Sequence, residues 1–424
     1  MLAVAALGLL ALLVGAPAAM AAAPTASGTT TDPAKAAAGY LARQLVGGDH
    51  YVFDFDGKTP DAGLTADGVF GMAAAKASGT ALTAATGWLA TNAGDYIDAA
   101  GAFGGPFPGS YAKLALVAEV TGGDPDAFGG LDLLGELTAL ECPAAGRADC
   151  APTETGLFKN ATKDGGFPNV VTQALAVLAL SRSDASADQP DTAAVDFLVG
   201  QQCPNGGFPS LIPAAGATCV SDVDGTAFAV QGLVSAGRDG PAGKALNWLQ
   251  SVRRPDGSFV GNGAPNANST AVAVQALLAG GRDAAQSVGW LRARQVGCAG
   301  LPAQHGAVTY AGTFDKSALR ATTQAAAALA GAPLTTLTSA GAAPDAPVLA
   351  CAAPPSTSPT GSPTAPPTAP PTSPAAAPAG NPAPQPGLAA TNGVSGSAVR
   401  LLAGLGAGLV VAGVAAILLV RRRA

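Results

Sequence analysis

The stretch from Ser221 to Asp239, SDVDGTAFAVQGLVSAGRD, has the pattern of a helix with defined ends. Its hydrophobic positions lie three or four residues apart and so share one helical face: Ala227, Val230 and Val234. Either Asp222 or Asp224 can cap the first turn, and Gly237 can end the helix in the left-handed conformation. The pattern therefore predicts a helix between the two aspartates and Gly237.

Similar segments occur elsewhere in the chain, each with a glutamine followed by a small residue. These glutamines are Gln173, Gln231, Gln275 and Gln324. Each unit also has a preceding helix with an aromatic-Leu pair: Tyr40-Leu41, Trp88-Leu89, Phe197-Leu198, Trp248-Leu249 and Trp290-Leu291, with 131–140 as a plainer copy. A pattern that recurs along the chain is an internal repeat, and a repeat sets the architecture.

Gly-rich turns join the two helices of a unit. QQCPNGGFPS at 201–210 aligns with SVRRPDGSFV at 251–260, and 165–168 and 104–108 are related forms. With degenerate copies at 65–79 and 109–123, the second helices number six. Variable spacing, Gly-rich turns and Ala-rich second helices favour a closed double ring. We predict an all-α fold, an α/α toroid of six helical hairpins, over residues 34–351.

Composition limits the function. The chain has 48% hydrophobic and 12% charged residues and a net charge of −6, although four of its arginines lie at the far C-terminus. An acidic surface repels phosphate backbones, so nucleic acid is not an expected partner. Only His50 and His305 are histidines, which argues against histidine-rich metal sites and histidine-based triads, and we expect no metal or cofactor.

All six cysteines follow the N-terminal apolar segment. An even number in an exported chain indicates disulfides, and proximity favours the pairs Cys142–Cys150, Cys203–Cys219 and Cys298–Cys351 among the possible connectivities. Zinc ligation is the alternative, but no CxxC pair is present.

Both ends of the chain carry export and anchoring signals. Residues 1–23 read as a signal peptide with an apolar core and a small-x-small site, although no basic residue precedes the core; a wrongly assigned start codon is our preferred explanation, and an N-terminal membrane helix the alternative. Residues 352–387 form a Pro/Thr/Ser/Ala stalk. Within the C-terminal region 388–424, residues 401–420 form a segment that is long and apolar enough to span a membrane, and a basic tail follows this segment.

The segment before this span resembles a sortase sorting signal, with Leu388, Ala389, Thr391 and Asn392. Asn392 stands where such signals have glycine, so covalent wall attachment and a retained membrane anchor both stay open. Either outcome predicts display outside the cell, at the surface of a high-GC Gram-positive bacterium.

The turns FLVGQQCPNGGF and WLQSVRRPDGSF resemble the repeat of prenyltransferases and squalene/hopene cyclases. The cyclase repeat ends in Gly-x-Trp, whereas this one ends in Gly-x-Phe. The resemblance covers roughly 300 residues and implies the toroid fold. It says little about activity, because that fold also includes cobalamin carriers and thioester domains.

Asp222-Val223-Asp224-Gly225-Thr226-Ala227 resembles the Asp-x-Asp-Asp-Thr-Ala acid motif of class II terpene cyclases. There the residue matched by Asp224 protonates an alkene or epoxide. Gly225 replaces the last aspartate, and the next repeat has Asn268 where this one has Asp224. We therefore interpret Asp222 and Asp224 primarily as helix-capping residues and weaker candidates for catalysis.

Other chemistries fit less well. A zinc site of the prenyltransferase kind would need His305 with Cys298 or Cys351, and the Gly-Cys-Gly-Glu-Gln thioester motif is absent. A cobalamin carrier would need a second small domain. In a glycan-active enzyme, Asp222, Asp224 and Asp315 would cluster at one mouth of the ring.

We therefore expect a surface-displayed binding or structural module without catalysis. Its candidate ligand-binding residues are Asp222, Asp224, Asn268 and Asp315. The alternatives are an enzyme acting on an isoprenoid or a glycan at the mouth of the ring, and a cobalamin-type small-ligand carrier. The tryptophans, at the helix anchors, are expected in the core rather than as sugar-stacking platforms.

Overall fold

The computed structural model describes residues 28–351, apart from 54–55, 99–105, 144–146, 161–167, 184–188 and 215. The predicted signal peptide, stalk, sorting motif and membrane span lie outside the described residues. Within the described part, no helix is both long and apolar enough to cross a membrane.

Six inner helices form a closed ring, in which each packs on the next along the chain and the last packs on the first. They are α2 (Ala62–Ala74), α5 (Pro108–Thr121), α7 (Val170–Arg182), α9 (Val223–Ser235), α11 (Ala267–Ala279) and α13 (Ala318–Ala330). The contact between α13 and α2 closes the ring, so the predicted toroid is confirmed.

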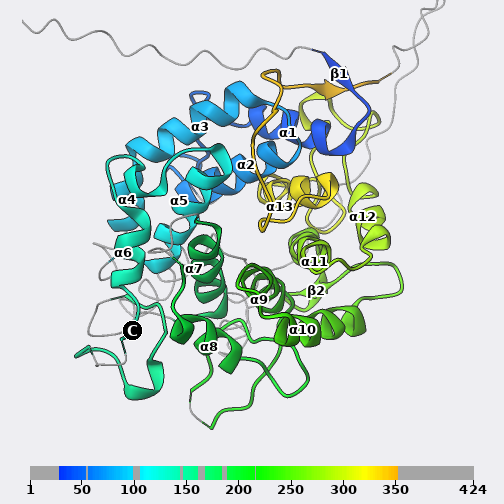
Figure 1. Ribbon diagram of the computed structural model, residues 1–424. Helices are drawn as coiled ribbons and strands as arrows, with labels where there is room; N and C mark the ends of the chain where they lie inside the picture. Colours follow the sequence, from blue (N-terminus) through cyan, green and yellow to red (C-terminus); the bar gives the residue numbers. More distant parts are fainter. Residues whose placement is uncertain are drawn as a thin grey trace, which may run out of the picture.

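Six outer helices surround this ring (Figure 1). They are α1 (Pro33–Arg43), α3 (Gly79–Thr91), α6 (Leu133–Ala139), α8 (Thr192–Gly200), α10 (Asp239–Val252) and α12 (Ala285–Arg292). Each packs on its own hairpin partner and on the inner helix before it, and α1 does so on α2 and α13. A short helix, α4 (Ala93–Asp98), lies between α3 and α5, and 3-10 turns occupy Pro125–Ala127, Pro152–Glu154 and Pro302–Gln304.

The two rings differ in burial because they face different surroundings. Inner helices carry apolar or small side chains on nearly every side and are almost wholly covered. In α11, eleven of the thirteen residues are buried. Outer helices bury one stripe, and their anchor leucines are at most 1% exposed: Leu41, Leu89, Leu198, Leu249 and Leu291. The aromatic-Leu pairs in the sequence therefore mark the inward stripe of the outer ring.

A Gly-x-Phe turn before several inner helices requires glycine. Gly206 and Gly257 have φ of +93° and +90°, and an added Cβ would lie 2.9 Å and 2.6 Å from a carbonyl oxygen of the next outer helix. Gly156 and Gly306 also have positive φ, and a Cβ added to either would clash with a carbonyl oxygen of α8 or α1. The related form predicted at 165–168 lies almost wholly outside the described residues, and the turn with this geometry before α7 is Gly156-Leu157-Phe158. Gly306 packs against α1, so this turn joins the last unit of the ring to the first described helix.

The inner helices also share a threonine that holds the turn. Thr226 Oγ1 accepts the backbone N–H of Phe208 at 2.8 Å, and Thr270 Oγ1 accepts that of Phe259 at 3.0 Å. In α7 the same task falls to Gln173, whose Oε1 accepts the N–H of Phe158 at 3.0 Å. The predicted alignment of Gln173 with Gln231 and Gln275 was therefore wrong. An Ala-rich helix has few side chains by which the repeats can be aligned, so an alignment based on the glutamine alone gave the wrong register.

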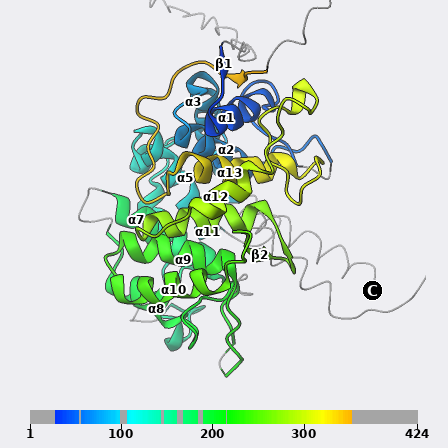
Figure 2. The same cartoon turned by 90° about the vertical axis from the view of Figure 1, so that its right-hand side faces the viewer.

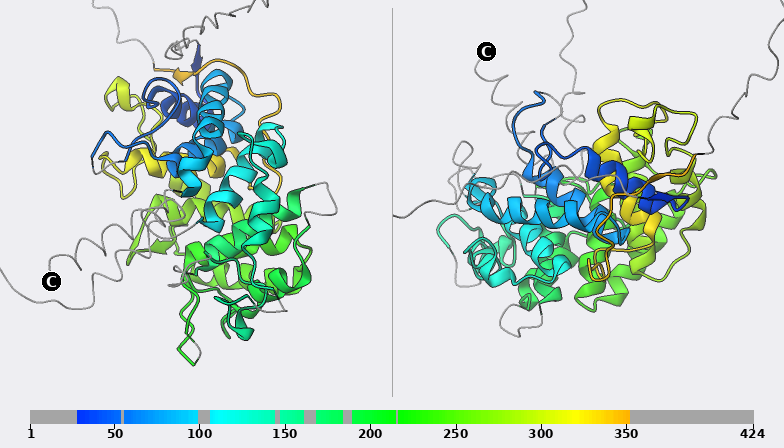
Figure 3. Two further views of the ribbon diagram at one scale, coloured as in Figure 1. Left: turned by 90° about the vertical axis from the view of Figure 1, so that its left-hand side faces the viewer. Right: turned by 90° about the horizontal axis from the view of Figure 1, so that it is seen from above.

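The described chain after α13 is a strap, residues 332–351, that crosses the end of the ring formed by the last turns of the inner helices. The backbone N–H of Leu334 donates to Gln231 Oε1 at 3.0 Å, and the Arg182 guanidinium donates to the carbonyls of Leu334 and Leu337 at 2.6 and 2.8 Å. The strap then pairs as β4 (Val348–Leu349) with β1 (Thr29–Thr30) in parallel. Both ends of the described chain therefore leave the ring side by side (Figures 2 and 3).

Three disulfides brace this architecture with the predicted pairing: Cys142–Cys150, Cys203–Cys219 and Cys298–Cys351. The third ties the end of the strap to the loop after α12. Because disulfides persist in oxidising surroundings, they indicate an extracellular or otherwise oxidising compartment.

Candidate functional site

The strap covers one end of the ring, and the first two turns of the inner helices form the other end, which we call the mouth. Buried polar side chains gather there on α2, α5, α9, α11 and α13. They divide into two halves that differ in charge pairing.

The paired half spans α13, α2 and α5. Arg320 donates to Asp61 Oδ2 at 2.8 Å, and Lys113 Nζ donates to Asp67 Oδ1 at 2.8 Å. All four residues are buried. Burial by itself lowers the pKa of Lys113, but the charge and hydrogen bond of Asp67, with smaller contributions from Tyr96 and Asp61, together outweigh it, so the pKa is raised. The ammonium is therefore held charged.

The unpaired half spans α9 and α11. It contains Asp224, Asn268 and Ser269, which are 4%, 1% and 0% exposed. Asp224 Oδ1, Asn268 Oδ1 and Ser269 Oγ are all buried and lack a hydrogen-bond partner among the described residues. Buried polar atoms without partners are uncommon in folded proteins, and each calls for an explanation in structure or in function.

Asp224 is the acid of this half. Its pKa is raised to about 7: burial is the largest cause, the negative charge of Asp222 adds to it, and the nearby Ser269 hydroxyl, which does not reach hydrogen-bond geometry, lowers it. No described Lys or Arg contributes to this balance. Asp224 therefore titrates near neutral pH, unlike an ordinary surface aspartate.

Asp224 does not cap its helix, which corrects the interpretation from sequence. The cap is Asp222, whose Oδ1 accepts the N–H of Gly225 at 2.9 Å. In the next unit Asn266 does the same for Ser269 at 2.9 Å. Asp224 and Asn268 occupy the second helical position of their units, so the Asp–Asn alternation between repeats concerns the mouth and not the cap.

The surroundings of Gly225 explain why the acid motif lacks its last aspartate. A Cβ at this position would lie 2.4 Å from the carbonyl oxygen of Pro209 in the preceding turn. An aspartate there would have to displace backbone. The resemblance to the cyclase motif therefore holds for Asp222, Asp224 and Thr226 but not for the residue between them.

The remaining candidates are not brought to this site. Asp315 is exposed and accepts from the N–H and hydroxyl of Ser317, as a turn residue does. Trp290 is buried in the core as predicted, and Trp88 and Trp248 are half-buried against it. The residues missed from sequence are Asp61, Asp67, Lys113, Ser269 and Arg320. Lone charges inside Ala-rich segments were the available signal for Lys113 and Arg320.

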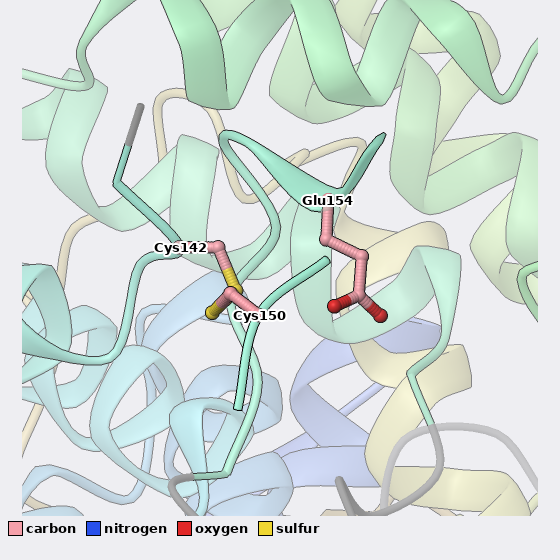
Figure 4. Close-up of side chains that lie close together, drawn as sticks. All are labelled: Cys142, Cys150 and Glu154. Carbon is pink, nitrogen blue, oxygen red and sulfur yellow. A yellow bond between two sulfur atoms is a disulfide. The ribbon is translucent and has the colours of Figure 1, made fainter. Parts of the chain in front are cut away.

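The cysteines do not offer a zinc site in this structure. Cys142 and Cys150 lie close to Glu154, as Figure 4 shows, but their sulfurs form a disulfide and Glu154 pairs with Lys159 at 2.8 Å. His305 lies near Cys351, which is likewise bonded to Cys298. A sulfur in a disulfide is not a thiolate ligand, so the two zinc alternatives weighed for these cysteines are excluded by the pairing.

No known protein-family model matches the chain, and no curated protein matches it in sequence. Solved structures do match it in shape. A type II terpene cyclase, MstE, from Scytonema is 15% identical with a TM-score of 0.49, covering 70% of this chain and 96% of that one. An unsaturated glucuronyl hydrolase from Bacillus sp. GL1 is 12% identical with a TM-score of 0.48, covering 70% and 95%.

A Candida albicans protein geranylgeranyltransferase-I is 13% identical with a TM-score of 0.44, covering 66% of this chain and 89% of that one. These proteins differ in activity, so the likeness concerns the fold. The closed double ring of helices defines the class: the protein is a disulfide-braced α/α toroid with a buried, partly unpaired polar mouth.

Proposed function

We propose that the protein is a surface-displayed toroid that binds an extracellular ligand at the α9–α11 half of its mouth, without catalysis. One observation carries the proposal: three buried polar atoms there, on Asp224, Asn268 and Ser269, have no partner among the described residues. Asp67 Oδ2 and Arg320 Nη1 in the paired half also lack a hydrogen-bond partner, but their side chains are already held in ion pairs. A ligand that hydrogen-bonds to them recovers free energy that the folded chain leaves unused.

The chemistry of these atoms favours a ligand rich in hydroxyl or amide groups. Asn268 Oδ1 accepts hydrogen bonds, the Ser269 hydroxyl donates or accepts, and Asp224 does either according to its protonation. A hydrocarbon isoprenoid satisfies none of them, whereas a glycan satisfies several. The glycan is therefore the preferred ligand class. A cobalamin carrier keeps the fold but has no supporting observation among the described residues.

Display outside the cell is part of the same proposal. The three disulfides fit an oxidising compartment, and the predicted signal peptide, stalk, sorting motif and membrane span form one export and anchoring scheme. The strap ends at Cys351, where the predicted stalk begins, and the disulfide to Cys298 holds that point against the ring. A load on the stalk is thus transmitted to the body of the toroid and not to the strap alone.

The second candidate is an enzyme in which Asp224 is a general acid. The observation in its favour is the pKa of about 7, which suits proton transfer at neutral pH. Asp224→Asn separates the two candidates, because asparagine keeps the hydrogen-bonding capacity and removes the acidic proton.

The test is to purify the protein from producing cells and identify co-purifying molecules by mass spectrometry, in wild type and Asp224→Asn. The proposal predicts a hydroxyl-rich ligand retained by both and unchanged by either. Turnover of glycan or isoprenoid substrates by the wild type, lost in Asp224→Asn, would replace binding with catalysis. A hydrocarbon ligand would contradict the preferred class.

A further inference from the structure

A hollow of about 280 Å³ lies at the junction of the start of α9, the end of α10 and β2 (Val260–Gly261), which pairs antiparallel with β3 (Ala264–Pro265). Figure 2 shows these elements beside one another. The residues that line the hollow are Ser221, Asp222, Val223, Trp248, Val252 and 260–263. It borders the mouth at the start of α9, but Asp224, Asn268 and Ser269 do not line it.

The lining of the hollow combines apolar side chains with one carboxyl group. Val252 and Val260, at 37% and 38%, are two of the few large hydrophobic side chains exposed on the described surface. Trp248 is half-buried among them, and Asp222 is the one ionisable group in the lining. The neighbouring cations are engaged elsewhere: Arg253 donates to the Asp283 carbonyl, and Arg254 pairs with Asp256.

The next repeat shows what such a tryptophan contacts. Trp290 is the counterpart of Trp248 at the outer-helix anchor, and its face is covered by the guanidinium of Arg294 at 3.2 Å from the ring centroid. Asp256 accepts from Trp290 Nε1 at 3.3 Å, so a carboxylate stands beside the pair. The residue one helical turn after Trp248 is Val252, whose side chain carries no cation.

The third tryptophan follows the same pattern. Trp88 stacks on His50 with ring centroids 4.8 Å apart. Two of the three anchor tryptophans are therefore covered by a nitrogen-containing side chain of the protein itself, and Trp248 faces a hollow. Aromatic faces attract cations, arginine above all, and the acidic chain adds a favourable field for them.

We propose that the hollow at Trp248 binds an arginine side chain of an extracellular protein partner, in the way that Arg294 covers Trp290. Asp222 supplies the carboxylate beside it, and Val252 and Val260 contact the apolar residues that flank the arginine. The guanidinium lies against Trp248 and its charge faces Asp222. The proposal uses none of Asp224, Asn268 and Ser269, so its test does not depend on a ligand at the mouth.

The experiment uses the full chain labelled with 5-fluorotryptophan, whose three fluorine resonances are assigned with Trp→Phe variants. The probes are two short peptides of sequence Leu-X-Leu, with X either arginine or citrulline, which has the same shape without the charge. The arginine peptide should move the Trp248 resonance alone, and the citrulline peptide should bind about tenfold more weakly, as expected for loss of a cation–π and charge contact.

Two variants sharpen the test. Val252→Arg places an arginine where Arg294 stands in the next repeat, so it should move the Trp248 resonance without peptide and abolish the response to it. Asp222→Asn should weaken arginine-peptide binding about tenfold while keeping the cap, because Asn266 already caps α11 in the same way. Equal binding of the two peptides, binding of a neutral pyranose in their place, or no binding by any probe would each overturn the proposal.

Discussion

The two halves of the mouth use the same residue types to different ends. On α13, α2 and α5 the aspartates Asp61 and Asp67 are buried against Arg320 and Lys113. The buried Asp224 lies on α9, Asn268 and Ser269 lie on the adjacent α11, and no described cation pairs with Asp224. Burial alone therefore does not mark a functional acid. A paired buried acid is part of the scaffold, whereas an unpaired one is held at a free-energy cost that the fold does not recover.

The largest expected effect comes from breaking the pair between α2 and α5. Lys113→Met leaves the buried carboxylate of Asp67 without its cation, which should destabilise the protein by about 3–5 kcal/mol. The free energy of unfolding in urea measures this loss. The double variant Asp67→Leu/Lys113→Met is the control: it removes both charges and should return stability to near the wild type. A single variant as stable as wild type would show that the pair is not structural.

The unpaired half should respond in the opposite direction. The folded-state pKa of Asp224 is raised to about 7, so only the folded chain holds this proton between about pH 4 and 7, and stability falls as pH rises through that window. The loss attributable to Asp224 is on the order of 4 kcal/mol. Asp224→Asn should remove this dependence.

The comparison that checks this is the unfolding free energy of wild type and Asp224→Asn at pH 5 and pH 7.5. The variant should be the more stable of the two at pH 7.5, and its advantage should shrink at pH 5. Parallel pH curves for the two proteins would mean that Asp224 does not carry a raised pKa.

The features that could be predicted from the sequence are those set by residues close together in the chain. The six hairpins, the leucine stripe and the disulfide pairing arise from patterns within a unit or between nearby cysteines, so they could be read in advance. The contact between Asp61 and Arg320 joins residues 259 apart, and only the closed ring brings them together. The strap has no helical or strand periodicity, and its place is fixed by Arg182 and Gln231.

Asp224 shows a different limit. Its spacing from Thr226 suited both a cap and an acid, and only the backbone conformation shows that Asp222 is the cap. A one-dimensional pattern does not distinguish the capping position from the second helical position when both hold aspartate.

A finer contrast compares the two capping aspartates. Asp61 caps α2 through Leu64 N–H and also binds Arg320, whereas Asp222 caps α9 and has no cation. Asp61→Asn keeps the cap but leaves the buried guanidinium without its counter-charge, and should cost about 2 kcal/mol. Asp222→Asn should change stability little. Equal effects in thermal unfolding would show that the Asp61–Arg320 pair adds nothing beyond the cap.

The smallest effect concerns the cap alone. Asp222→Ala removes the acceptor for Gly225 N–H and should destabilise the protein by about 1 kcal/mol. Asn266→Ala in the next repeat is the matched change and should cost a similar amount. A loss several times larger for Asp222→Ala would give Asp222 a role in the stability of the mouth beyond capping.

The central claim is that the unpaired half of the mouth is the half that binds. Native mass spectrometry of the protein isolated from producing cells tests it directly, by comparing ligand occupancy in wild type, Asn268→Leu and Asp67→Leu/Lys113→Met. We predict that Asn268→Leu loses the bound ligand while the double variant, altered only in the paired half, retains it. Full occupancy in Asn268→Leu, or loss in the double variant alone, would contradict the account.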